Sequence, residues 1–200
     1  ERIGFMPTSQ FTYQPEKEVT YELDANWALY CDNYLEGFHI PFLHKSLNKA
    51  IDYDRYKTVL FDHGSLQIGY AKEELDTFEL PEGHVDFGFN IAAYYFWLFP
   101  NLMLNFYPWG LSVNLVQPVS KNKTRVTFKS YVFNPSKQER GASGDLGLVE
   151  QEDEDVVHAV QKGIRSTGYS TGRFSPTREQ GVHKFHLMLS RFLNNDLSGL

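Results

Sequence analysis

The sequence predicts an α+β domain in which helices cover one face of a curved antiparallel sheet. Segments rich in aromatic and β-branched residues follow one another through the middle of the chain, separated by short turns, as in an antiparallel meander. Segments with helical periodicity stand before and after them. A length of 200 residues suits one domain with a sizeable core. This arrangement leaves a concave interior in which a ligand could sit.

The first helix is predicted after Asp24 or Asn26, either of which can cap its start. Its apolar positions recur with helical spacing and form one aromatic face, which consists of Trp27, Tyr30, Cys31, Tyr34, Leu35 and Phe38. Pro41 lacks a backbone donor and disfavours helix at the residue before it. The helix should therefore end near His39, and the chain should turn just before His44.

Six strands are expected next. Residues 57–61 and 65–71 flank Asp62-His63-Gly64, which predicts a hairpin. Four further strands are predicted at residues 92–99, 102–107, 111–119 and 124–133. Residues 73–90 mix acids with proline and glycine, and we expect an irregular excursion that lines or covers a pocket.

Two helices close the chain. The glycine-rich residues 141–144 should interrupt the backbone before a helix at about 146–164. Ser175-Pro176 then supplies an N-cap and a proline at the first helical position, which predicts a long last helix that runs to Leu193.

Composition excludes several classes of function. A formal net charge of −6 without a basic run gives no footprint for nucleic acid. The single Cys31 cannot form an internal disulfide, a zinc knuckle or a cysteine-ligated iron–sulfur cluster, so histidine and carboxylate must hold any metal. No apolar stretch has the length of a membrane span, and the residues at Glu1 do not form a secretory signal. We therefore expect a cytoplasmic protein, with a processed or trimmed start.

One acid of the 146–164 helix falls on its apolar face. At about 100° per residue, Asp153 lies within a stripe formed by Leu146, Val149, Val156, Val157, Val160 and Ile164. Glu152 and Asp155 point away from this stripe, as solvated acids do. Burying an unpaired carboxylate is costly, so Asp153 needs a cation, a proton or a hydrogen-bond network. A salt bridge to an arginine, or a less regular helix, would explain it without a site.

The first helix offers partners for Asp153. Asp32, Glu36 and His39 follow one another at i, i+4 and i+7 along a polar flank, and His44 comes five residues after His39. Two histidines on either side of a helix end can converge on one ion. With Asp153 they would form the two-histidine, one-carboxylate facial triad that holds non-haem Fe(II) and leaves positions open for oxygen and substrate.

Two stretches of sequence resemble a known family. The iron-site signature of the catalytic domain of Rieske-type non-haem iron oxygenases, the ring-hydroxylating oxygenase α subunits, closely resembles Asn26-Trp27 followed by Asp32-Asn33-Tyr34-Leu35-Glu36-Gly37-Phe38-His39-Ile40-Pro41-Phe42-Leu43-His44. The C-terminal third of that family resembles residues 150–153, 160–163 and 172–186. The resemblance spans essentially the whole chain.

This resemblance implies roles for individual residues. His39, His44 and Asp153 would be the iron ligands. Glu36 would bridge to a cluster ligand of a neighbouring subunit and pass the electron, although a solvated helix acid explains it equally well. Asn33 would orient a ligand or the active-site water, with capping or a surface hydrogen bond as the alternative.

The resemblance also implies a fold and partners. The fold would be of the helix-grip type (START/Bet v 1-like), with a long C-terminal helix laid across a curved antiparallel sheet. Residues 1–200 would form a single catalytic non-haem iron domain without the N-terminal Rieske domain, whose [2Fe–2S] cluster needs two cysteines and two histidines. Electrons would come from a Rieske cluster on the same or a neighbouring subunit and from a reductase, and the full-length protein would form a homotrimer.

The resulting hypothesis is an oxygenase. It would activate O2 at a mononuclear Fe(II) and hydroxylate or oxidatively demethylate a small aromatic or quaternary-amine substrate. The aromatic run at residues 94–97, with Phe99, Phe106, Tyr107 and Trp109, could line the pocket, and cation–π contacts would suit a quaternary ammonium. Asn105 and Asn114 are the first candidates for orienting a substrate. The alternative is a non-catalytic helix-grip domain that binds an apolar ligand.

Overall fold

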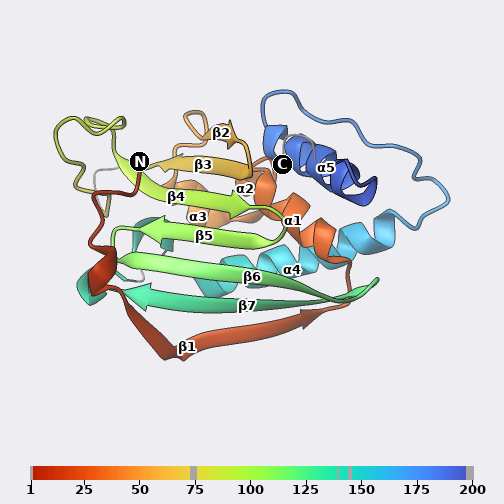
Figure 1. The fold of residues 1–200 in the computed structure, drawn as a ribbon, viewed down its shortest axis with the longest axis horizontal. Helices are drawn as coiled ribbons and strands as arrows, with labels where there is room; N and C mark the ends of the chain where they lie inside the picture. The colour runs from red at the N-terminus through yellow and green to blue at the C-terminus, as the bar shows by residue number, and fades with distance from the viewer. Residues whose placement is uncertain (1, 73–75, 139, 144–145, 197–200) are drawn as a thin grey trace.

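The computed structural model describes residues 2–72, 76–138, 140–143 and 146–196, and in these ranges it contains a seven-stranded antiparallel sheet (Figure 1). The spatial order of the strands is β1-β7-β6-β5-β4-β3-β2. Their bounds are Thr12–Leu23 for β1, Lys57–Phe61 for β2, Gly64–Tyr70 for β3, Ile91–Leu98 for β4, Leu102–Tyr107 for β5, Gly110–Ser120 for β6 and Lys123–Val132 for β7.

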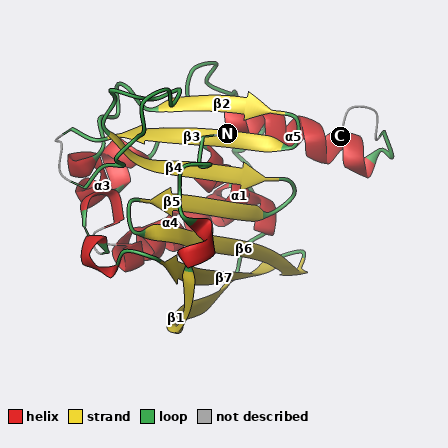
Figure 2. Cartoon of the chain, turned by 60° about the vertical axis from the view of Figure 1, so that its left-hand side comes forward, coloured by secondary structure: helices red, strands yellow, loops and turns green. Residues whose placement is uncertain are grey.

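Five α-helices accompany the sheet in the part of the chain that the structure describes. They are α1 (Trp27–Leu35), α2 (Ile40–Leu43), α3 (Lys45–Ala50), α4 (Leu146–Gly163) and α5 (Gln180–Leu193). Helices α1, α4 and α5 lie over the same face of the sheet (Figures 1 and 2). The predicted α+β class, with a helix-grip sheet and a C-terminal helix across it, is confirmed. None of the helices in the described ranges is both long and apolar enough to cross a membrane.

The main core lies between the helices and the sheet. Cys31 and Leu35 of α1 are fully buried, as is Phe185 of α5, whose ring centroid lies 5.2 Å from that of Trp97 on β4. The outer face of the sheet has a cover of its own, in which Met6 and Phe78 belong to one buried cluster with strand residues. The 76–90 segment is irregular, as expected, and it covers the outer face of the sheet, where Phe78 packs against Tyr94 and Asp86 accepts a hydrogen bond from the Tyr94 hydroxyl. Residues 73–75 of the predicted excursion lie outside the described ranges.

Strand β1 lies outside the segments that the sequence predicts as strands. It pairs with β7 at the edge of the sheet, and its register shifts between Gln14 and Val19. Pro15 and the charged residues that follow it interrupt the alternation of apolar and polar side chains that identifies a half-buried strand. Proline, charges and bulges are common on edge strands, where they block pairing with another sheet.

The first helix begins as predicted and ends earlier. The side chain of Asn26 caps its start by accepting a hydrogen bond from the backbone N–H of Ala28 at 3.0 Å. The helix ends at Leu35 because Glu36 is extended and Gly37 follows it. The expectation that the helix reaches His39 is therefore wrong. Pro41 lies in the first turn of α2, where its missing N–H has no helical partner to lose.

The last helix starts later than predicted. Ser175 and Glu179 close a separate turn, in which Glu179 accepts from the backbone N–H of Ser175 at 2.6 Å and Ser175 Oγ accepts from that of Arg178 at 3.3 Å. Helix α5 then begins at Gln180 with Glu179 as its N-cap. The Ser175-Pro176 pair therefore caps a turn that precedes the helix.

Candidate metal centre

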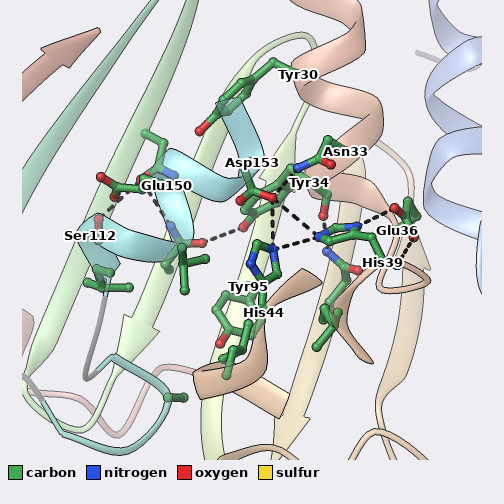
Figure 3. Close-up of a pocket in the computed structure, with 18 of the residues that line it drawn as sticks. Tyr30, Asn33, Tyr34, Glu36, His39, His44, Tyr95, Ser112, Glu150 and Asp153 are labelled. Atoms are coloured by element: carbon green, nitrogen blue, oxygen red, sulfur yellow. Dashed lines mark hydrogen bonds and ion pairs between the residues drawn. The ribbon is translucent and has the colours of Figure 1, made fainter. Parts of the chain in front are cut away.

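Three side chains from two distant parts of the chain converge at one point. His39 precedes α2, His44 separates α2 from α3, and Asp153 lies in the middle of α4. The two histidine Nε2 atoms are 3.0 Å apart, and Asp153 Oδ1 lies 3.0 Å from Nε2 of His44 and 3.5 Å from Nε2 of His39. Figure 3 shows the three groups facing one another.

The early end of α1 is what brings His39 to this point. The extended backbone at Glu36 and the short helix α2 place the two histidines on either side of one turn of helix. The predicted polar flank of a continuous helix is accordingly wrong. Asp32 remains on α1 and points elsewhere, since its Oδ1 pairs with Nε2 of His186 on α5 at 2.8 Å. His186 is thereby occupied outside the site.

Each imidazole is held at its outer nitrogen by a carboxylate. Glu36 Oε1 is paired with Nδ1 of His39, and Glu152 Oε2 lies 2.8 Å from Nδ1 of His44. Glu36 also accepts from the backbone N–H groups of Phe38 and His39, which fixes the turn. Glu152 was expected to be a solvated acid, and that expectation is wrong because His44 approaches α4 from beside the apolar stripe.

The partners of Asp153 are one side-chain amide and two imidazoles. Asn33 Nδ2 donates to its Oδ1 at 2.7 Å, and the two histidines complete its surroundings. Within the described ranges no arginine pairs with Asp153, and α4 is continuous through this position. The arginine salt bridge and the irregular helix are therefore both excluded as explanations of its place on the apolar stripe.

The donor set fits a divalent metal ion. A neutral histidine whose Nδ1–H donates to a carboxylate presents a lone pair at Nε2. The lone pairs of His39 and His44 would then both face the oxygen of Asp153, and a cation at their centre removes this repulsion. Neighbouring ligand atoms that each lie ~2.1 Å from a metal are ~3 Å apart, which matches the two separations of 3.0 Å, while the separation between His39 and Asp153 is longer, at 3.5 Å. These three atoms could hold a metal ion.

His44 is the most deeply buried of the three side chains, with 1% of its surface exposed. Burial alone would lower its pKa, but the hydrogen bonds and negative charges of Asp153 and Glu152 outweigh burial and raise it. The carboxylates therefore favour positive charge at this point, whether it is carried by a proton or by a metal.

A cavity opens beside the triad, between the helices and the sheet. Its floor is a row of residues that face one another across four strands: Gln67 of β3 opposes Tyr95 of β4, Tyr95 opposes Asn105 of β5, and Asn105 opposes Ser112 of β6. Cross-strand neighbours share one face of a sheet, so register alone assembles this floor.

A neutral hydrogen-bond chain runs over the floor. Tyr34 Oη of α1 donates to Asn105 Oδ1 at 2.6 Å, and Asn105 Nδ2 donates to Asn114 Oδ1 at 3.2 Å. Ser112 Oγ donates to the same oxygen of Asn114 at 3.3 Å. Asn105 and Asn114, the candidates from the sequence, therefore both line the cavity and hold each other in place.

Only part of the aromatic run reaches the cavity. Tyr95 lines it, whereas Tyr94 packs against Phe78 on the outer face because neighbouring strand residues point to opposite sides. Tyr107 of β5 also lines it, with its ring centroid 5.9 Å from that of Tyr95. Three further tyrosines line the cavity and were not predicted to do so: Tyr30 and Tyr34, which the sequence assigned to the aromatic face of the first helix, and Tyr56.

Glu150 is the acid of this cavity that sequence reasoning missed. It lies one turn before Asp153 on α4, and this spacing places both acids on one side of the helix. Burial raises the pKa of Glu150 to about 8, and the charges of Asp153 and Glu154 act in the same direction. The three-residue spacing from Asp153 was the signal that could have identified it.

Comparison with known proteins relates the chain to one family. Residues 11–195 match the family described as ring hydroxylating alpha subunit (catalytic domain). Choline monooxygenase of Arabidopsis thaliana is 34% identical over 178 residues, which cover 84% of this chain and 40% of that protein. The carnitine monooxygenase oxygenase subunit of Escherichia coli (strain K12) is 30% identical over 184 residues, covering 86% of this chain and 48% of that protein.

A solved structure gives the same fold. The structure of a quaternary ammonium Rieske monooxygenase superposes with a TM-score of 0.75 at 23% identity, over 92% of this chain and 51% of the other. The chain thus spans about half the length of the proteins that it matches, or less.

Proposed function

Because the chain belongs to the ring hydroxylating alpha subunit family, as its catalytic domain, we propose that His39, His44 and Asp153 hold a mononuclear non-haem Fe(II). The observation that carries this assignment is the convergence of the two Nε2 atoms on Asp153 Oδ1 while carboxylates hold both Nδ1 atoms. Bound iron would supply the oxygen-activating chemistry, with positions left open for O2 and substrate.

We propose that the chain forms the single catalytic domain of a monooxygenase acting on a small quaternary amine. Relatives named for choline and carnitine support this substrate class. The cavity supports it too, because its tyrosine rings offer π faces to a cation next to the triad. Asn33 would orient Asp153 as a ligand, and the sheet floor would orient the substrate.

The electrons would come from a Rieske [2Fe–2S] cluster outside residues 1–200, on the same or a neighbouring subunit, which a reductase would supply. Glu36 is suited to the connection because it contacts His39 and lines both the inner cavity and an outer groove formed with Phe38, Phe42 and Phe174. A neighbouring subunit of a homotrimer could present its cluster at this groove. We further propose the cytoplasm as the compartment, since its reducing conditions suit a lone thiol and a ferrous centre.

Metal analysis after anaerobic loading with Fe(II) tests the assignment. The wild-type protein should retain one iron per chain, while His39→Ala and Asp153→Ala should lose it. His63→Ala, which removes an exposed histidine from the β2–β3 turn, is the matched control and should retain it. A wild-type protein that binds no iron would leave a ligand-binding domain without oxygenase chemistry.

A further inference from the structure

The cavity beside the triad has an unusual balance of charge. Its acidic residues are Glu36, Glu150 and Asp153, and no lysine or arginine is found among the described residues that line it. Glu36 is paired with His39. Asp153 accepts a hydrogen bond from Asn33 and contacts His44. Glu150 makes no hydrogen bond or ion pair with any described residue, so one carboxylate facing the cavity lacks a partner.

Glu150 stands where a substrate would lie. It lies three positions before Asp153 on α4, which corresponds to a rise of about 4.5 Å along the helix axis. In Figure 3 it lies on the opposite side of Asp153 from His39. A cationic group held against Glu150 would therefore have its neighbouring carbon atoms beside the metal centre. Fe(II) with one carboxylate ligand keeps a net positive charge, and Glu150 would offset its repulsion of that cation.

The walls suit a cation but supply no positive charge. Tyr30 and Tyr107 lie near the carboxylate of Glu150, and their electrostatic interaction with it adds to the effect of burial. Burial raises the pKa of both phenols well above its ordinary value, so they remain neutral. Neutral phenol rings attract a quaternary ammonium through their π faces, whereas their hydroxyls can donate a hydrogen bond to a carboxylate but supply no positive charge to balance it.

The floor holds two buried polar atoms without a hydrogen-bond partner among the described residues, Oη of Tyr95 and Oε1 of Gln67, and only the second is limited to accepting. Gln67 is 2% exposed, and its Nε2 donates to the backbone carbonyl of Tyr34 at 2.7 Å. A carbonyl can only accept, so this bond establishes which end of the amide is the nitrogen. Oε1 of Gln67 then has no donor among the described residues, although Gln67 lies in the same row as Tyr95 and Asn105 on the cavity floor. A hydroxyl can satisfy this acceptor, whereas a carboxylate cannot.

We propose that Glu150 is the counter-charge for a cationic substrate group, and that the cavity selects a cationic alcohol and rejects a cation that also carries a carboxylate. This inference rests on the proposed function and goes beyond it, because it separates two substrates that the relatives' names leave together. A carboxylate would face Glu150 and the oxygen of Gln67 without any basic side chain to receive it.

Calorimetric titration of the iron-loaded protein under anaerobic conditions tests the proposal with four probes. The affinity for choline should be at least about ten times higher than the affinity for its neutral isostere, in which a carbon atom replaces the nitrogen. Choline should also bind more tightly than tetramethylammonium, which lacks the hydroxyl, and more tightly than carnitine, which carries a carboxylate. This series needs no variant and so does not depend on the folding of one.

The titrations are run at a pH above 8, where the carboxyl of Glu150, whose pKa is raised to about 8, is ionised. Under these conditions Glu150→Gln keeps the shape of the side chain and removes its charge. It should weaken choline binding about tenfold or more while leaving the neutral isostere unaffected. Asp155→Asn removes the same charge from an exposed position of α4 and should leave all four affinities unchanged. Carnitine binding as tightly as choline, or wild-type choline affinity in Glu150→Gln, would overturn the inference. Iron stoichiometry is measured on the same samples, so a protein without iron would instead refute the proposed function.

Discussion

Oε2 of Glu152 lies 2.8 Å from Nδ1 of His44, on the side of the imidazole opposite to the nitrogen that faces Asp153. Consecutive residues of one helix thus contact both nitrogens of a single histidine from an element more than 100 positions away. Such an arrangement fixes the tautomer and the orientation of the ring, and it makes the inner nitrogen more basic.

Glu152 should act as a positioning residue for His44. Glu152→Ala is expected to weaken Fe(II) affinity by roughly tenfold to a hundredfold. Glu152→Gln keeps an oxygen acceptor for Nδ1–H, so its Fe(II) affinity should lie between that of Glu152→Ala and that of the wild type. Competition with a chelator measures these affinities, and Asp155→Ala on the exposed side of α4 is the control. Wild-type affinity in Glu152→Ala would contradict the assignment.

Asn33 should contribute to the same centre through Asp153. Its Nδ2 donates to the Oδ1 that faces both histidines, so Asn33→Ala would free the carboxylate to rotate. We expect a loss of Fe(II) affinity of roughly tenfold, with little change in unfolding free energy. Chelator competition and urea unfolding separate the two effects. Asn122→Ala in the exposed turn between β6 and β7 serves as the control, and equal iron affinity in both variants would refute the prediction.

Glu150 should make the metal-free protein less stable at alkaline pH. Its pKa is raised from 4.5 to about 8, so the folded state holds the proton more tightly than the unfolded state. The stabilisation is complete below 4.5 and is lost as the pH rises through about 8. The groups that act on it are Asp153 and Glu154 on its own helix, with the neutral phenols of Tyr30 and Tyr107 opposite.

The glutamine variant isolates this effect. Above the pKa of Glu150, metal-free Glu150→Gln should be more stable than the wild type, by on the order of a few kcal/mol, and the difference should shrink in acid. Urea unfolding at several pH values measures it. A difference that is the same at all pH values would show that the carboxyl does not titrate in this range.

Gly181 should be intolerant of a side chain. A Cβ at this position of α5 would lie 2.7 Å from the backbone oxygen of Leu35, at the end of α1. Gly181→Ala must therefore push α5 away from α1, at an expected cost of roughly 1–3 kcal/mol in unfolding free energy. Gly147→Ala in α4 meets no atom within 4 Å and should stabilise the protein by up to about 1 kcal/mol. Thermal unfolding of both variants tests the contrast, and equal effects would contradict it.

Local patterns were sufficient for much of this protein. Alternation and turn residues located six strands, helical spacing located α1 and α4, and the wheel of α4 singled out Asp153. These features depend on residues within one element, where periodicity reports burial directly. Strand β1 was not predicted because Pro15 and its charged neighbours interrupt the alternation of apolar and polar residues. The start of α5 was predicted too early because Ser175 caps a turn whose sequence resembles a helix start.

Contacts between distant elements had to come from the folded chain. The early end of α1 turns His39 toward His44, and the approach of His44 to α4 converts Glu152 from an apparent surface acid into its partner. Strand register assembles Gln67, Tyr95 and Asn105 into one floor below Glu150. A helix wheel shows which side a residue occupies within its own helix, but the neighbour on that side is set by packing. The sequence was therefore sufficient to propose the three ligands. The carboxylates that hold their outer nitrogens, and the charge of the cavity, were decided by tertiary packing.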